Sequence, residues 1–97
     1  STQQNSYYWA VVIEMIYAEF LNLGHEIDRD GVHEWFLMKY NYKELVNEDS
    51  GQVERIPQRS KTLSKSEFFD YVEKVRKFAA EFLNLYIPDP DEQLKAL

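Results

Sequence analysis

The 97-residue sequence contains no cysteine and only three glycines and three prolines. Without cysteine, disulfide bonds and thiolate metal sites are excluded, and the composition fits a reducing, cytoplasmic environment. Three glycines are too few for a glycine-rich phosphate-binding loop. The main apolar stretch, residues 7–23, contains two glutamates and has no positively charged segment before it. We therefore expect neither a membrane-spanning helix nor a signal peptide.

Basic residues are also scarce, since 11 of them against 17 acidic residues give a net charge of −6. An acidic chain argues against a broad nucleic-acid-binding surface, because phosphates favour basic surfaces. The bases are clustered, however. The stretch from residue 55 to residue 65 contains no acid and four bases, which are Arg55, Arg59, Lys61 and Lys65. This segment is either a solvated loop or a phosphate-binding site, and the sequence leaves both interpretations open.

Aromatic residues are abundant, with seven tyrosines, six phenylalanines and two tryptophans. This content argues for a packed core rather than a disordered chain, and the length favours one domain. We predict a single helical domain over residues 1–90 and a short tail over residues 91–97. The fold class is mainly α, with a three-helix core around the N-terminal helix and a short irregular hairpin or loop between helices 2 and 3.

The N-terminal helix is expected to begin at Ser1 or Thr2 and to end before Gly24. Helical periodicity places six apolar residues on one face: Trp9, Val12, Ile13, Ile16, Phe20 and Leu23. A second apolar face carries Tyr7, Val11, Ala18 and Leu21. A helix that is apolar on two faces is usually enclosed, so the second face needs a cover from this chain or from another. We predict that these four residues form the interface of a symmetric homodimer.

Two further helices have clear start signals. Asp28 is a suitable N-cap for a helix over Arg29–Tyr40, and Ser64 with Glu67 has the spacing of a capping box. The second of these helices carries an apolar stripe of Phe68, Val72, Val75, Ala79, Phe82 and Leu83. On its outer face, Asp70–Lys74 and Glu73–Lys77 are spaced as acid–base pairs. Between the two helices, segments 43–46 and 52–56 could pair as the hairpin, with Pro57 ending the second strand.

The sequence gives no sign of catalysis or of a cofactor. His25, Asp28, Asp30 and His33 have the side chains of a metal site, but their spacing matches neither the helical histidine pair of a zinc protease nor a calcium loop. Neither histidine has the sequence spacing to a serine or threonine that would indicate a catalytic nucleophile. We therefore predict no catalytic residues, no metal and no cofactor, and we expect that this protein is not an enzyme.

The basic segment is the best functional candidate. Its amide and hydroxyl side chains, Gln58, Ser60 and Thr62, suit contacts to phosphate, and it leads into a helix N-terminus, where backbone N–H groups favour anions. Arg76 lies at the flank of the third helix's stripe and has no acid four residues before it. The predicted nucleic-acid-binding residues are therefore Arg55, Arg59, Lys61, Lys65 and Arg76.

Several segments resemble one family in order and spacing. Gln3–Ala10 (QQNSYYWA) resembles the glutamine-asparagine, tryptophan-alanine signature of the phage NinB/Orf recombination proteins. Asp28–Phe36 resembles that family's second-helix segment, and Arg59–Phe69 and Lys77–Glu81 resemble its last long helix and the approach to it. The similarity covers most of residues 4–90. The family's proteins begin with a small β-containing part before this signature, so the chain resembles their C-terminal portion.

The resemblance implies a function in phage DNA recombination inside the host cell. It implies a protein that binds single-stranded DNA, forms dimers and helps to load a recombinase past single-strand-binding protein. On this basis the basic segment is the expected DNA-facing surface. The alternative is a non-catalytic protein-interaction or dimerisation module, which would act through the N-terminal helix or the tail.

Overall fold

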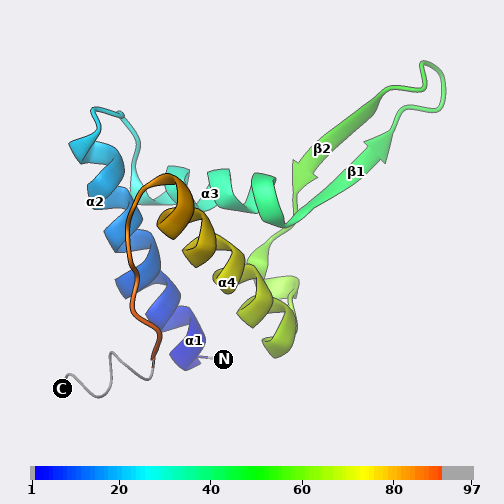
Figure 1. Cartoon of the computed structure of the whole chain (residues 1–97). Coiled ribbons are helices and arrows are strands. Elements are labelled where there is room, and N and C mark those ends of the chain that lie inside the picture. The colour runs from blue at the N-terminus through cyan, green and yellow to red at the C-terminus, as the bar shows by residue number, and fades with distance from the viewer. Residues whose placement is uncertain (1, 91–97) are drawn as a thin grey trace.

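The computed structural model describes residues 2–90 of the chain. The predicted tail, residues 91–97, and the possible cap Ser1 lie outside the described residues. The mainly helical class and the antiparallel hairpin are both confirmed (Figure 1). The helices gather in one body, and the hairpin projects away from it. Within residues 2–90, every helix falls short of the length and apolarity that crossing a membrane requires.

The N-terminal helix is continuous but not regular. It consists of α1 (Thr2–Tyr7), the π-helical segment η1 (Tyr8–Ile13) and α2 (Glu14–Asn22). A π-helix bonds residue i to residue i+5, so each turn is wider and the residues before it are rotated relative to a regular α-helix. This rotation carries Tyr8 into the core. The predicted face is therefore wrong at its ends, because Tyr8 is fully buried and Leu23 is 55% exposed.

Helix ends follow the predicted signals. Gly24 has a φ of +91°, and its N–H binds the carbonyl of Leu21 while the N–H of His25 binds that of Phe20. This is a Schellman motif, which needs a left-handed residue after the helix. The Asp28 carboxylate accepts a hydrogen bond from the N–H of Gly31, so it caps α3 (Arg29–Tyr40) as expected.

The hairpin follows α3 directly. Strands β1 (Tyr42–Val46) and β2 (Val53–Pro57) are antiparallel, with Val46 opposite Val53. The turn between them contains Gly51 at a φ of +74°. Apart from its base the hairpin is exposed on both faces, including the side chains of Leu45, Val46 and Val53.

The short 3-10 helix η2 (Ser60–Thr62) leads into α4 (Lys65–Phe82). The predicted capping box of Ser64 and Glu67 is present in both directions. The predicted stripe is wrong at its C-terminal end, because Phe82 is 69% exposed, and it omits the buried Tyr71. The helix ends after Phe82, and the chain turns at Asn84, which has a φ of 51°. Phe82 faces solvent, whereas Leu83 is partly buried and packs against the core.

The core draws on the N-terminal helix, α3, α4 and the segment 83–90. Its fully buried large side chains are Tyr8, Val12, Ile13, Ile16, Val32, Phe36, Leu37 and Val75. Segment 83–90 runs back beside the N-terminal helix (Figure 1), and it buries Ile87. The Tyr7 hydroxyl donates a hydrogen bond of 2.6 Å to the carbonyl of Pro88. The chain itself therefore covers part of the helix face that was predicted to need a partner.

Candidate nucleic-acid interface

The three predicted arginines all bind groups of the protein. Arg55, on β2, lies 3.9 Å from the Glu44 carboxylate and stacks over the Tyr42 ring at 4.3 Å from its centre. Both members of that ion pair are more than half exposed, so it is a weak surface interaction. Because Arg55 is part of β2, it lies on the hairpin and away from the start of α4.

Arg59 binds both carboxylate oxygens of Glu34 on α3, at 2.5 Å and 3.0 Å. This paired geometry fixes the loop before α4 against α3. The guanidinium of Arg59 lowers the pKa of the Glu34 carboxyl, because it stabilises the charged form. Arg59 therefore has a structural role, and its charge is partly neutralised before any phosphate arrives.

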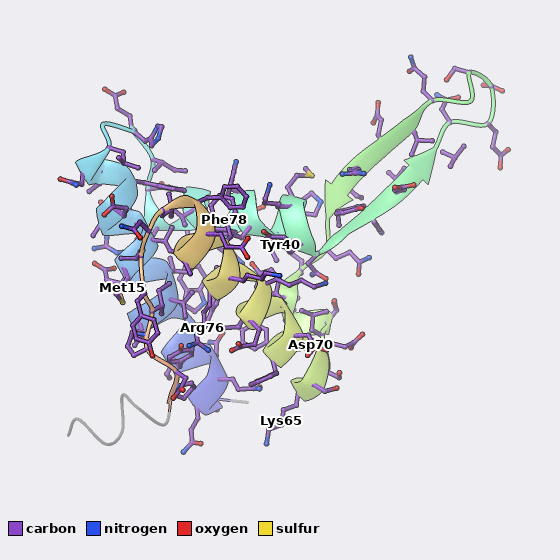
Figure 2. The ribbon with its side chains drawn as sticks, in the orientation of Figure 1. Met15, Tyr40, Lys65, Asp70, Arg76 and Phe78 are labelled. Atoms are coloured by element: carbon purple, nitrogen blue, oxygen red, sulfur yellow. The ribbon has the colours of Figure 1, made fainter. Side chains whose placement is uncertain are left out.

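Arg76 is the most buried of the three, with 17% of its side chain exposed. It lies on α4 (Figure 2) and donates to the Glu73 carboxylate at 2.6 Å and to the carbonyl of Ile87 through two nitrogens. These contacts hold segment 83–90 against the helices. The sequence suggested that Arg76 had no acid partner four residues away, but its partner is three residues before it.

Lys61 and Lys65 differ from the arginines. Both are exposed, and neither has an acidic partner within residues 2–90. Lys61 lies in η2 and Lys65 is the first residue of α4, so both ammonium groups are close to the start of this helix. Figure 2 shows Lys65 at that end of α4, pointing into solvent. Of the five predicted residues, these two are available to an anion.

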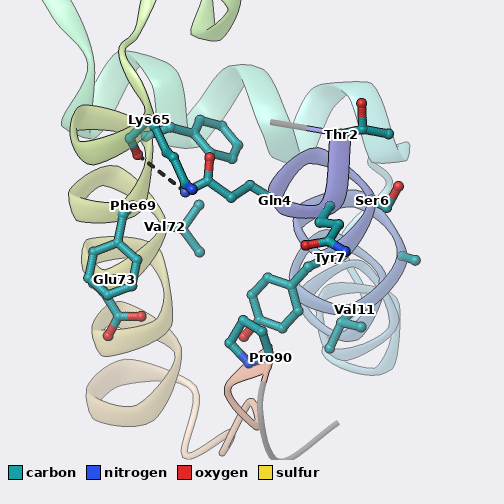
Figure 3. A pocket seen from close by; sticks show the side chains of 13 residues that line it. Thr2, Gln4, Ser6, Tyr7, Val11, Lys65, Phe69, Val72, Glu73 and Pro90 are labelled. Atoms are coloured by element: carbon teal, nitrogen blue, oxygen red, sulfur yellow. Dashed lines mark hydrogen bonds between the residues drawn. The ribbon is translucent and has the colours of Figure 1, made fainter. Parts of the chain in front are cut away.

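A groove of about 490 Å³ opens beside Lys65, between the N-terminal helix and α4. Figure 3 shows Lys65 and Phe69 on the α4 side and Tyr7 and Val11 on the opposite side. The Gln4 amide donates to the Lys65 carbonyl at 3.2 Å and joins the two sides. The Phe69 ring is 54% exposed at the rim. Two acidic residues are also present. Glu73 lines the groove, and Asp70 lines a second, shallower depression together with Lys65.

The four predicted interface residues fall into two groups that differ in burial. Tyr7 and Val11 line the groove and are half-buried, whereas Ala18 and Leu21 are exposed further along α2. Burial raises the pKa of the Tyr7 hydroxyl to about 12, so it stays protonated as the donor to Pro88. Two of the four residues are thus exposed and two are half-buried, and their role in a dimer interface stays a prediction.

A buried polar cluster lies behind the groove, and no motif in the sequence predicts it. The Tyr8 hydroxyl is 2.6 Å from Nδ1 of His33 and 2.8 Å from the Tyr71 hydroxyl. These residues come from η1, α3 and α4, so the cluster ties three helices together. Burial raises the pKa of both tyrosines and lowers the pKa of His33, so all three groups are neutral near pH 7. The only sequence signal is the off-stripe position of Tyr8 and Tyr71.

Phe69 is the second residue that sequence reasoning missed. It follows the buried Phe68 and falls outside the apolar stripe of α4, so its ring points away from the core. An exposed phenylalanine beside an exposed lysine offers a stacking surface and a positive charge. These two features together are typical of sites for single-stranded nucleic acid.

Comparisons with family models, with curated proteins and with solved structures find no match for this chain. The similarity of the sequence motifs to the NinB/Orf proteins therefore stays a prediction. The structure defines a small helical protein with a projecting hairpin and a lysine-flanked aromatic groove.

Proposed function

We propose that this chain is an accessory domain of phage DNA recombination that binds single-stranded DNA through the start of α4. It acts without catalysis in the cytoplasm of the host cell, as a homodimer, and mediates recombination with single-strand-binding protein. The single observation that carries the DNA-binding part is the pair of Lys65 and the exposed Phe69 at the groove, with the exposed Lys61 on the short helix just before α4. The phage setting and the partner protein are supported by the sequence resemblance.

The chemistry of this cluster fits an unpaired strand. Ammonium groups on Lys61 and Lys65 attract phosphates, and the Phe69 face can stack on a base regardless of its identity. Gln4, Ser64 and Ser66 line the same region and offer amide and hydroxyl donors. Asp70 and Glu73 repel phosphate, so we expect weak binding that falls steeply with salt.

The experiment is fluorescence anisotropy of a labelled oligothymidine across a salt series. Lys61→Ala combined with Lys65→Ala should weaken binding and reduce the salt slope by about 1.4, since each phosphate contact on single strands contributes about 0.7. The matched control is Lys74→Ala combined with Lys77→Ala, which removes two exposed lysines from the outer part of the same helix. Equal losses from the two pairs would show diffuse attraction and would contradict a site.

The aromatic part has its own control. Phe69→Ala should weaken binding by roughly 5- to 150-fold, because stacking on an aromatic ring contributes about 1–3 kcal/mol per base. Phe82 is the control residue. It is exposed on the same helix as Phe69 but lies at the other end, away from the groove. Phe82→Ala should leave the affinity unchanged, and a loss as large as that of Phe69→Ala would refute a stacking role at the groove.

The second candidate function is a non-catalytic protein-interaction or dimerisation module. The observation that favours it is the projecting hairpin, whose apolar side chains Leu45, Val46 and Val53 are 47–62% exposed. If the isolated chain shows no DNA binding at low salt but associates firmly, this second function replaces the first.

A further inference from the structure

The two edges of the hairpin differ in their capacity to bind another strand. In an antiparallel pair, main-chain groups point alternately toward the partner strand and away from it. The N–H of Asn47 binds the carbonyl of Gln52, and the N–H of Gln58 binds that of Asn41. Odd-numbered residues of β1 therefore point inward, and Tyr42, Glu44 and Val46 direct their N–H and C=O groups outward.

The outer edge of β2 is formed by Val53, Arg55 and Pro57, each opposite an outward residue of β1. Proline has no N–H, so this edge is blunted at its base, as edge strands often are. The β1 edge has no such block. It presents three uninterrupted residues with both donors and acceptors, and two of the side chains near its tip, Leu45 and Val46, are apolar and exposed.

A two-stranded sheet that is exposed on both faces is marginally stable in water, and a third or fourth strand stabilises it. We propose that the β1 edge pairs with the β1 edge of a second copy of this chain, giving a four-stranded antiparallel sheet across a two-fold axis. A two-fold contact is self-complementary, because the same edge supplies donors and acceptors in both copies. A second copy of this chain can therefore bind this edge, and no other protein is needed to complete the pairing.

The side chains select the register. An axis at Glu44 would place the two Glu44 carboxylates directly opposite each other, and like charges in that position destabilise a sheet. An axis at Leu45 places the two Leu45 side chains opposite each other in a non-hydrogen-bonded pair, where side chains approach most closely. Glu44 of each copy then exchanges main-chain hydrogen bonds with Val46 of the other. Cross-strand apolar pairs of this kind stabilise a sheet, so the Leu45 axis is the one we assign.

The first test removes one outward donor. Val46→Pro deletes the N–H of Val46, which β2 does not use, so the hairpin's own ladder is preserved. By symmetry one substitution removes two hydrogen bonds from the dimer, and the dimer dissociation constant should rise roughly 30-fold. Val53→Pro is the matched control, because Val53 lies directly opposite Val46, is similarly exposed and has its N–H on the other edge. It should leave the dimer intact.

Sedimentation velocity of the full chain, over a range of concentrations, measures this difference. Circular dichroism of each variant checks that the helical body is unchanged. Loss of the dimer in Val46→Pro and its retention in Val53→Pro supports the proposal. Monomer alone for the parent at high micromolar concentration overturns it, and so does equal loss in both variants. Dimer loss in Val11→Glu without loss in Val46→Pro also overturns it, because the interface would then lie on the N-terminal helix.

The second test reads the register directly, because the chain has no cysteine of its own. With the axis at Leu45, the Leu45→Cys variant should form an intermolecular disulfide in mild oxidant, since residues paired there are within disulfide reach. Glu44→Cys is the control, because its two thiols lie opposite Val46 and not each other. Faster cross-linking of Glu44→Cys than of Leu45→Cys overturns the assigned register. Both results are independent of DNA binding, so failure here leaves the DNA-binding part of the proposed function intact.

Discussion

The buried hydroxyl of Tyr8 allows the sharpest test of the fold. It is 2.6 Å from Nδ1 of His33 and 2.8 Å from the Tyr71 hydroxyl, and its side chain has no exposed surface. The Tyr8 hydroxyl therefore links the other two groups, with one hydrogen bond to His33 and one to Tyr71. Tyr8→Phe keeps the ring but leaves the Tyr71 hydroxyl without its partner at a site that is 3% exposed.

The expected cost follows from that geometry. A buried polar group left unsatisfied costs about 1–3 kcal/mol. For a domain of this size, 1 kcal/mol shifts the melting temperature by roughly 4–8 °C, so we expect a loss of roughly 5–20 °C. Tyr71→Phe should cost less, because Tyr8 then keeps its hydrogen bond to His33. The double variant should cost less than the sum of the two, since removing both hydroxyls leaves no orphaned donor between them.

Urea and thermal unfolding followed by circular dichroism measure these differences. Tyr42→Phe is the control, because its hydroxyl has no hydrogen-bond partner among the described residues and it should melt with the parent. The reasoning would be refuted if Tyr8→Phe melted within a degree or two of the parent. Strict additivity of Tyr8→Phe and Tyr71→Phe would also refute it, because the two hydroxyls would then not interact.

Two further predictions concern His33 and the α4 cap. Burial lowers the pKa of His33, so the unfolded chain takes up this proton first as pH falls. The associated stability is complete above about pH 6.5 and is lost as pH falls from there toward the folded pKa. His33→Gln should flatten that part of a urea-stability profile, and an unchanged profile would contradict the assignment. The lowered pKa values of the Glu14 and Glu34 carboxyls add a separate loss below about 4.5. Ser64→Ala should cost about 1 kcal/mol in urea unfolding by removing the cap of α4, whereas Ser66→Ala, next to it, should cost a few tenths at most.

Local signals in the sequence predicted most of the secondary structure. Asp28, Gly24 and the Ser64–Glu67 pair each act through backbone groups a few residues away, so short-range chemistry was enough to place them. The hairpin was placed by the polar turn ending in Gly51. What failed was the assumption of one constant helical period. On α4 the prediction failed at Phe82, which is exposed, although Leu83 next to it packs against the core.

The candidate site was predicted only in part. Charge clustering selected Lys61 and Lys65, which are exposed, but it also selected Arg55 and Arg59, which bind carboxylates. Arg76 was added because it had no acid four residues before it, and it binds Glu73 and the carbonyl of Ile87. The partners of Arg55 and Arg59 lie 11 and 25 residues before them, so no local pattern reveals these pairs. Phe69 was missed for the opposite reason. Helical periodicity placed Phe68 on the stripe and Phe69 off it, but the off-stripe position of Phe69 was not interpreted as an exposed ring.

The π-helical segment η1 connects the core to the groove, and it explains why the two cannot be altered independently. Its wide turn places Tyr8 in the core while Tyr7 and Val11, on the same stretch, face the groove. If η1 reverted to a regular α-helix, the residues before it would rotate about the helix axis, since fewer residues would then span each turn. Gln4 would move away from the Lys65 carbonyl, and Tyr7 away from Pro88. The hydrogen bonds of Tyr8 to His33 and Tyr71 hold the wide turn in place from the core side. We therefore expect Tyr8→Phe to change the shape of the groove beside Lys65, although Tyr8 does not line the groove.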